Sequence, residues 1–141
     1  SKRIKQALQS VKTALAYPRL YRIGHANILG ADIAELLKRT KKSIANALVA
    51  QQKALIREIK KREIIIETNP TSNIMIRGIT YEDHPIATFD KHGIPYAIST
   101  DDRITFDTNL KKEFYRIARA LKWTPQDIKR AAQMQRKALL R

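Results

Sequence analysis

Three groups of polar residues stand out because each directly follows a short apolar run. His25 follows the first run, Asn69 to Asn73 follow the second, and Asp101 and Asp102 follow the third. Enzymes built on parallel strands place their active sites at the carboxyl ends of those strands, so an imidazole and two carboxylates are candidates for joint chemistry. Each group also has a purely structural alternative. Paired aspartates often form a turn or a helix cap, and a lone histidine is often simply buried.

The elements that must position these residues are short strands alternating with helices. Apolar periodicity predicts helices over residues 2–15, 32–62, 82–91 and 110–121 and from 125 onward, and strands over 20–23, 63–67 and 95–98. The long pattern over 32–62 predicts either a break near residues 41–43 or a projecting arm. The alternation is typical of βα units in a parallel sheet. Because three strands leave edges and faces of such a sheet uncovered, we expect part of a larger sheet.

The charge of the chain is strongly positive and unevenly distributed. The 141 residues include 28 Lys and Arg against 13 Asp and Glu, for a net charge of +15. Residues 1–62 hold 15 of the basic residues and three of the acidic ones. This asymmetry fits an anionic partner, either nucleic acid or an acidic protein face, but also an ordinary solvated surface. Aromatic residues that could stack on bases are almost absent there, so we expect nucleic-acid binding less than a solvated or partner-contacting surface.

Composition also excludes several classes of protein. The chain has no Cys, which rules out a disulfide framework and a Cys-based zinc finger. With 43% hydrophobic residues and only four Gly and five Pro, it is neither collagen-like nor wholly disordered. No apolar stretch reaches the ~20 residues that cross a bilayer, so we expect no membrane partner and a soluble, cytoplasmic protein.

Four motifs in register resemble the last part of the adenosine and AMP deaminases. They are Arg22-Ile-Gly-His25, Asn69-Pro-Thr-Ser-Asn73, His84-Pro85-Ile86 and Ser99-Thr-Asp-Asp102. Two later segments, Glu113-Phe-Tyr115 and Trp123-Thr-Pro-Gln-Asp127, resemble the end of the same family, so the resemblance covers about residues 18–135. It implies an α/β fold over residues 1–141, the C-terminal part of a (β/α)8 barrel. This part of the barrel would comprise about three βα units, and the long basic helical segment over residues 31–62 is an insertion relative to the family.

The resemblance also implies a function and a role for three residues. It implies a zinc-dependent hydrolysis that removes the amino group at C6 of a purine nucleoside or nucleotide. Asp101 would be the carboxylate ligand of the zinc, Asp102 would bind N7 of the purine, and His25 would act on the metal-bound hydroxide. These residue types suit that chemistry, because zinc takes oxygen and imidazole ligands and lowers the pKa of its water to about 7.

Several features of the chain depart from the family pattern. The remaining zinc ligands and the catalytic acid of the family lie in a His-x-His and a His-Ala-Gly-Glu segment, and neither segment is present. Ala26 stands where the family usually has Gly, and Arg103 stands where Pro is common. We therefore expect the chain to work with the rest of the barrel or with a partner chain, and to be inactive alone. The alternative is an inactive basic module, for binding or assembly, on a degenerate deaminase scaffold.

Overall fold

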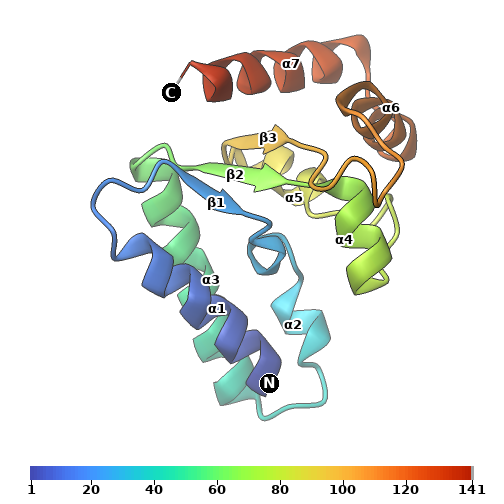
Figure 1. The fold of residues 1–141 in the computed structure, drawn as a ribbon. Helices are drawn as coiled ribbons and strands as arrows, with labels where there is room; N and C mark the ends of the chain where they lie inside the picture. The colour runs from blue at the N-terminus through green and yellow to red at the C-terminus, as the bar shows by residue number, and fades with distance from the viewer. Residues whose placement is uncertain (141) are drawn as a thin grey trace.

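The computed structural model describes residues 1–140, which form seven α-helices and a three-stranded sheet (Figure 1). In chain order the elements are α1 (Lys2–Leu15), β1 (Arg22–Gly24), the 3-10 turn η1 (Asn27–Leu29), α2 (Ile33–Leu36), α3 (Lys42–Lys61), β2 (Ile65–Thr68), α4 (Pro70–Arg77), α5 (Ile86–His92), β3 (Tyr96–Ile98), α6 (Leu110–Ala120) and α7 (Pro125–Leu139). The predicted alternation of helices and strands is confirmed. The fold is α/β with a small parallel sheet, which is consistent with part of a barrel.

Two helical predictions had different outcomes. The long pattern over 32–62 breaks as expected, into α2 and α3, and α3 packs against α1 and α2 rather than projecting as an arm. Helix α4 was not predicted, because Asn69-Pro70 was interpreted as a stop after the strand. Proline is favoured in the first turn of a helix, where its missing N–H costs nothing, and Pro70 occupies that turn of α4.

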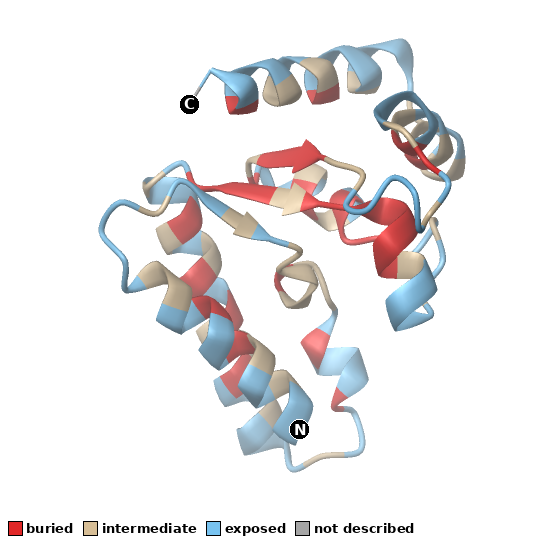
Figure 2. Ribbon diagram, viewed as in Figure 1, coloured by how far each residue is buried: buried red, intermediate tan, exposed pale blue. Residues whose placement is uncertain are grey.

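The three strands run parallel in the order β1-β2-β3. Ile66 of β2 pairs with Ile23 of β1 and with Tyr96 of β3. Because side chains alternate along a strand, Ile66 and Tyr96 enter the main core, whereas Ile65 packs in a smaller cluster with Ala138 of α7. Figures 1 and 2 show α7 on one side of the sheet, α1 and α3 on the other, and the buried faces turned inward.

The outer edge of β3 is covered by a side chain. Gln135 of α7 accepts the backbone N–H of Ile98 at 2.8 Å and donates to its carbonyl at 3.1 Å. These two hydrogen bonds replace the pair that a neighbouring strand would form with Ile98. Among residues 1–140 no strand pairs with the outer edge of β1 or of β3. None of the helices in that range is long and apolar enough to span a membrane.

Candidate functional site

His25 and Asp101 meet at the carboxyl end of the sheet. His25 directly follows β1 and Asp101 lies three residues after β3, yet His25 Nε2 and Asp101 Oδ2 are 4.0 Å apart. Each side chain is 39% exposed, so both remain open to a ligand. Both residues have left-handed backbones, with φ of 62° at His25 and 55° at Asp101. Non-glycine residues adopt this region at a cost of about 1–2 kcal/mol, and such strain concentrates at functional sites.

The first turn of α4 holds both residues. The Ser72 hydroxyl donates to Asp101 Oδ2 at 2.7 Å, and Asn73 Oδ1 lies 2.8 Å from His25 Nδ1. Ser72 and Asn73 are themselves at most 1% exposed, so their side chains have little freedom. Helix α4, which follows the middle strand β2, therefore orients the polar residues that follow the two outer strands.

A buried carboxylate on α6 fixes the start of α4. Glu113 is 0% exposed and accepts the backbone N–H of Thr71 at 2.9 Å. It also accepts the hydroxyls of Thr71 and Thr108, and Arg116 Nη1 lies 3.6 Å from it. A carboxylate at a helix N-terminus satisfies amide donors that the helix leaves unpaired. Glu113 thus anchors the turn that carries Ser72 and Asn73.

Helix α3 holds the loop that follows His25. Gln52 of α3 is 8% exposed, and its amide donates to the carbonyls of Ile28 and Ala31 at 2.8 Å each. Ala26 in this loop has φ 41° and ψ 31°, a left-handed conformation that glycine adopts without strain. The departure from the family pattern at Ala26 therefore falls on a residue whose backbone conformation favours glycine.

Asp102 faces its own loop in this structure. Its Oδ1 accepts the backbone N–H of Ile104 at 2.9 Å and of Thr105 at 3.0 Å, and its Oδ2 accepts the Thr105 hydroxyl at 2.6 Å. The Thr105 hydroxyl and the Thr105 and Ile104 amides hold the pKa of the Asp102 carboxyl below its ordinary value. Purine N7 is an acceptor, so a carboxyl that binds it must carry a proton. The predicted contact with N7 therefore requires Asp102 to leave these turn hydrogen bonds.

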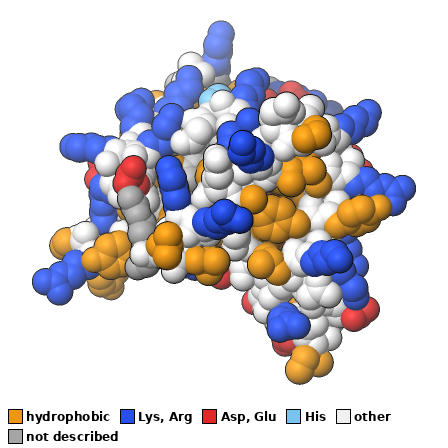
Figure 3. Space-filling model, turned by 90° about the horizontal axis from the view of Figure 1, so that it is seen from above, with side chains coloured by type: hydrophobic (Ala, Val, Ile, Leu, Met, Phe, Trp, Pro, Cys, Tyr) orange, Lys and Arg blue, Asp and Glu red, His pale blue; other side chains and the backbone are white. Residues whose placement is uncertain are grey.

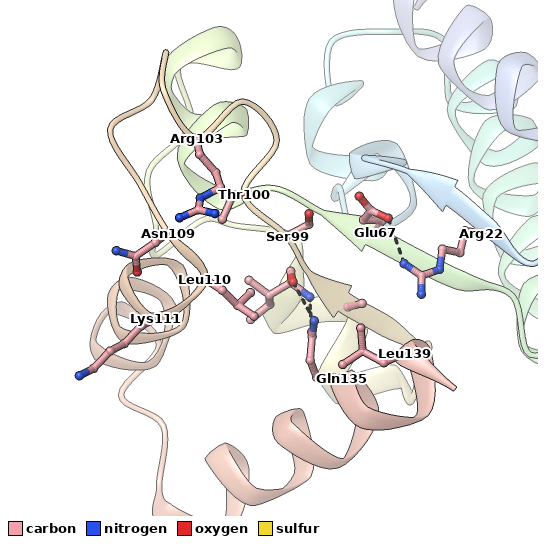
Figure 4. Close-up of a pocket in the computed structure, with 12 residues that line it drawn as sticks. Arg22, Glu67, Ser99, Thr100, Arg103, Asn109, Leu110, Lys111, Gln135 and Leu139 are labelled. Carbon is pink, nitrogen blue, oxygen red and sulfur yellow. Dashed lines mark hydrogen bonds and ion pairs between the residues drawn. The ribbon is translucent and has the colours of Figure 1, made fainter. Parts of the chain in front are cut away.

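The larger surroundings are basic and hollowed. A pocket of about 480 Å³ lies between the sheet, α6 and α7, and its lining includes Arg22, Glu67, Ser99 and Gln135 (Figure 4). Arg22 and Glu67 form an ion pair at 3.3 Å in this pocket. His25 and Asp101 do not line this pocket, which therefore lies beside the candidate site and is not part of it. Figure 3 shows a face dominated by Lys and Arg, with hydrophobic side chains grouped between them.

Comparison with known proteins decides the family. A family profile described as "Adenosine deaminase" matches residues 5–139, nearly the whole chain. The chain belongs to the adenosine deaminase family. The chain is 37% identical over 70 residues to an adenosine deaminase of Vibrio atlanticus. This alignment covers 49% of the present chain and 21% of that protein. It is 40% identical over 73 residues to an aminodeoxyfutalosine deaminase of Streptomyces coelicolor, covering 51% of this chain and 19% of that protein. These matches span about a fifth of the relatives' length.

The metal expected of an adenosine deaminase needs more ligands than this part of the chain brings together. Within residues 1–140 no three His, Asp or Glu side chains are close enough to hold an ion. Asp101 fits the role of a single oxygen ligand. The Ser72 hydroxyl donates to its Oδ2, whereas its Oδ1 accepts no hydrogen bond within residues 1–140. His25 fits a place beside the ion, since its Nε2 faces Asp101.

Four residues that support the candidate site stand in the motifs quoted above, but the sequence assigned no role in that site to them: Ser72, Asn73, His84 and Glu113. Two of them lie in the Asn69-Pro-Thr-Ser-Asn73 motif after the second strand. Glu113 had a detectable signal, because it lies one helical turn before the buried Ile117 and thus on the buried side of α6. His84 was expected at a helix start, and its Nδ1 indeed accepts the first amide of α5, from Ile86, at 3.3 Å.

Proposed function

We propose that this chain is the C-terminal portion of a zinc-dependent deaminase that hydrolyses the 6-amino group of a purine nucleoside or nucleotide. In the reaction, water adds at C6 and ammonia leaves, so that adenosine gives inosine. The observation that carries the proposal is the convergence of His25 and Asp101 at 4.0 Å, each held by a buried residue of α4. Relatives named for the deamination of adenosine and of aminodeoxyfutalosine support the same reaction class.

Three residues have distinct parts in this proposal. Asp101 supplies one oxygen ligand to the zinc, whose chemistry is to lower the pKa of a bound water to about 7. His25 orients and stabilises the attacking oxygen from the opposite side of the gap. Asp102 binds N7 of the purine once its loop releases it from Thr105. The other ligands and the catalytic acid are expected from the remaining units of the barrel.

The deciding experiment compares two proteins. The 141-residue chain, dialysed against micromolar zinc, should hold no stoichiometric metal by elemental analysis and should convert no adenosine to inosine by absorbance. The full reading frame that contains this chain should hold zinc and release ammonia from at least one 6-aminopurine nucleoside or nucleotide. Activity of the isolated chain would contradict its proposed dependence on further ligands. A zinc-loaded full protein inactive on adenosine, AMP and related 6-aminopurines would contradict the deaminase proposal itself.

The basic inactive module has less support. The lysine-rich segment 31–62 is not a free arm, because α3 buries Leu48, Leu55 and Ile59 in the core. The candidate site instead contains His25, Ala26 and Asp101, three of the six non-glycine residues with positive φ among residues 1–140, and the buried Ser72 and Asn73 hold two of them. We therefore propose catalysis rather than binding as the role of this scaffold.

A further inference from the structure

His84 is a deeply buried titratable residue that has no part in the proposed reaction. It is 1% exposed, and burial lowers the pKa of its imidazole to about 4, so the ring is neutral. Its Nδ1 lies 3.3 Å from the backbone nitrogen of Ile86. Its Nε2 lies 3.1 Å from the side-chain amide of Asn73 and 3.5 Å from the Thr68 hydroxyl. Every polar atom of the ring is therefore engaged inside the protein.

The same Asn73 amide also contacts the candidate catalytic residue. One of its two polar atoms lies 2.8 Å from His25 Nδ1, and the other faces His84 Nε2. Asn73 is 1% exposed, so water does not compete for these contacts. A single buried amide thus connects one ring nitrogen of His84 to one ring nitrogen of His25.

The direction of this connection follows from one fixed donor. The backbone N–H of Ile86 can only donate, so His84 Nδ1 must accept. A neutral imidazole then carries its single proton on Nε2, and that proton needs an acceptor. The Thr68 hydroxyl, at 3.5 Å, is at the limit of a hydrogen bond, so the Asn73 amide at 3.1 Å is the better-placed partner. Of the two amide atoms of Asn73, only the oxygen accepts. The consistent network therefore has this oxygen toward His84 and the nitrogen toward His25, an exchange of the two atoms by a half-turn of the amide.

A second buried amide supports this orientation. Asn27 Nδ2 is buried and has no hydrogen-bond partner, while its Oδ1 lies 3.3 Å from the amide nitrogen of Asn73. With both amides turned, the Asn27 nitrogen donates to the Asn73 oxygen, and the buried Asn27 atom without a partner becomes the oxygen. The arrangement thus removes the meeting of two donors at His84 Nε2 and leaves an unpaired acceptor, which is less costly than an unpaired N–H, at Asn27.

We propose that His84 is a positioning residue which, through the side-chain amide of Asn73, holds His25 in the tautomer with its proton on Nε2. That nitrogen is the one that lies 4.0 Å from Asp101 Oδ2. His25 then presents a hydrogen-bond donor, not a base, to an oxygen bound between the two residues. The catalytic meaning of this tautomer rests on the proposed function, whereas the tautomer itself is a property of the chain alone.

The test is nuclear magnetic resonance of the 141-residue chain labelled with ¹⁵N-histidine, at about pH 8, above the ordinary histidine pKa of ~6.5. The ring-nitrogen shifts report which nitrogen carries the proton. We expect a single Nε2–H tautomer at His25 in the wild type and a mixture of tautomers in His84→Phe. Asn73→Asp should invert the tautomer to Nδ1–H, because a carboxylate only accepts. His92→Gln, at the end of α5, is the matched control and should leave His25 unchanged.

Two results would overturn the proposal. One is a wild-type His25 protonated on Nδ1, and the other is a folded His84→Phe or Asn73→Asp variant whose His25 keeps the wild-type tautomer. Should His84→Phe fail to fold, the inversion in Asn73→Asp decides alone, and a wild-type Nδ1–H tautomer would overturn the proposal without any variant. Because no step of this experiment measures deamination, its result is independent of whether the proposed function holds.

Discussion

The carboxylate of Glu113, fully buried on α6, accepts the backbone N–H of Thr71 at 2.9 Å in the first turn of α4. Removing it leaves that amide and the hydroxyls of Thr71 and Thr108 without their acceptor. Glu113→Ala should therefore lower the free energy of unfolding by about 3 kcal/mol, measured by urea denaturation. Glu82→Ala, an exposed acidic position, is the matched control and should stay within ~0.5 kcal/mol of wild type. Equal effects of the two substitutions would show that Glu113 does not anchor α4.

The left-handed backbone of Ala26 predicts a stabilising substitution. Ala26→Gly removes about 1–2 kcal/mol of strain and loses part of the contact that the methyl group makes with the core, for a net gain of about 0.5–1 kcal/mol. Ala54→Gly, in the exposed interior of α3, should instead cost about 1 kcal/mol. Urea midpoints of both variants check the opposite signs. A destabilised Ala26→Gly would refute the strain at this loop.

Burial of His84 predicts a pH dependence of stability. Its pKa is about 4 in the folded chain and ordinarily 6.5, so the unfolded chain binds more protons between these values. The contribution of His84 to stability is complete above about pH 6.5, falls as the pH drops toward 4 and is constant below that, a loss of up to about 3 kcal/mol. The difference in unfolding free energy between wild type and His84→Phe, followed from pH 7.5 to about 4, isolates this contribution from the carboxylates. A difference that does not change with pH would contradict a neutral, buried His84.

In the longer deaminase proposed above, three alanine variants separate the roles of the polar residues after the strands. Asp101→Ala should lose zinc and activity together, because a site with one ligand fewer binds the ion weakly. Asp102→Ala should keep zinc and lose ~10²-fold or more in activity, since it removes the purine contact and the turn hydrogen bonds with Ile104 and Thr105 but no metal ligand. His25→Ala should keep most of the metal and lose kcat.

The zinc content of each variant, by elemental analysis, and its kcat and KM test these expectations. Asp107→Ala is the matched control, since this aspartate lies in the same loop with a side chain that is 99% exposed. Zinc lost from Asp102→Ala but kept by Asp101→Ala would reverse the two assignments. Near-normal activity in all three variants would exclude a catalytic role for this part of the chain.

Much of the fold could be predicted from local signals. Apolar residues at helical spacing placed α1 at residues 2–15, where the structure has it, and Pro125 after Thr124 correctly marked the start of α7. Thr124 and Asp127 form a reciprocal capping box there, an interaction within one turn of chain. Helix α4 was not predicted because Asn69-Pro70 can either end a strand or begin a helix, and the contact with Glu113 that fixes its start joins segments far apart in the chain.

The sequence by itself determined which chemical groups are available and in what order they follow the strands. Apolar β-branched runs prefer a buried sheet, and parallel strands bring their carboxyl ends to one edge, so His25 and Asp101 were expected at the same edge of the sheet. Only the tertiary structure decided how they are held. The contacts of Ser72 with Asp101, of Asn73 with both histidines and of Gln52 with the loop after β1 join segments distant in sequence. Such contacts depend on packing distances of a few ångströms, which the pattern of residue types does not encode.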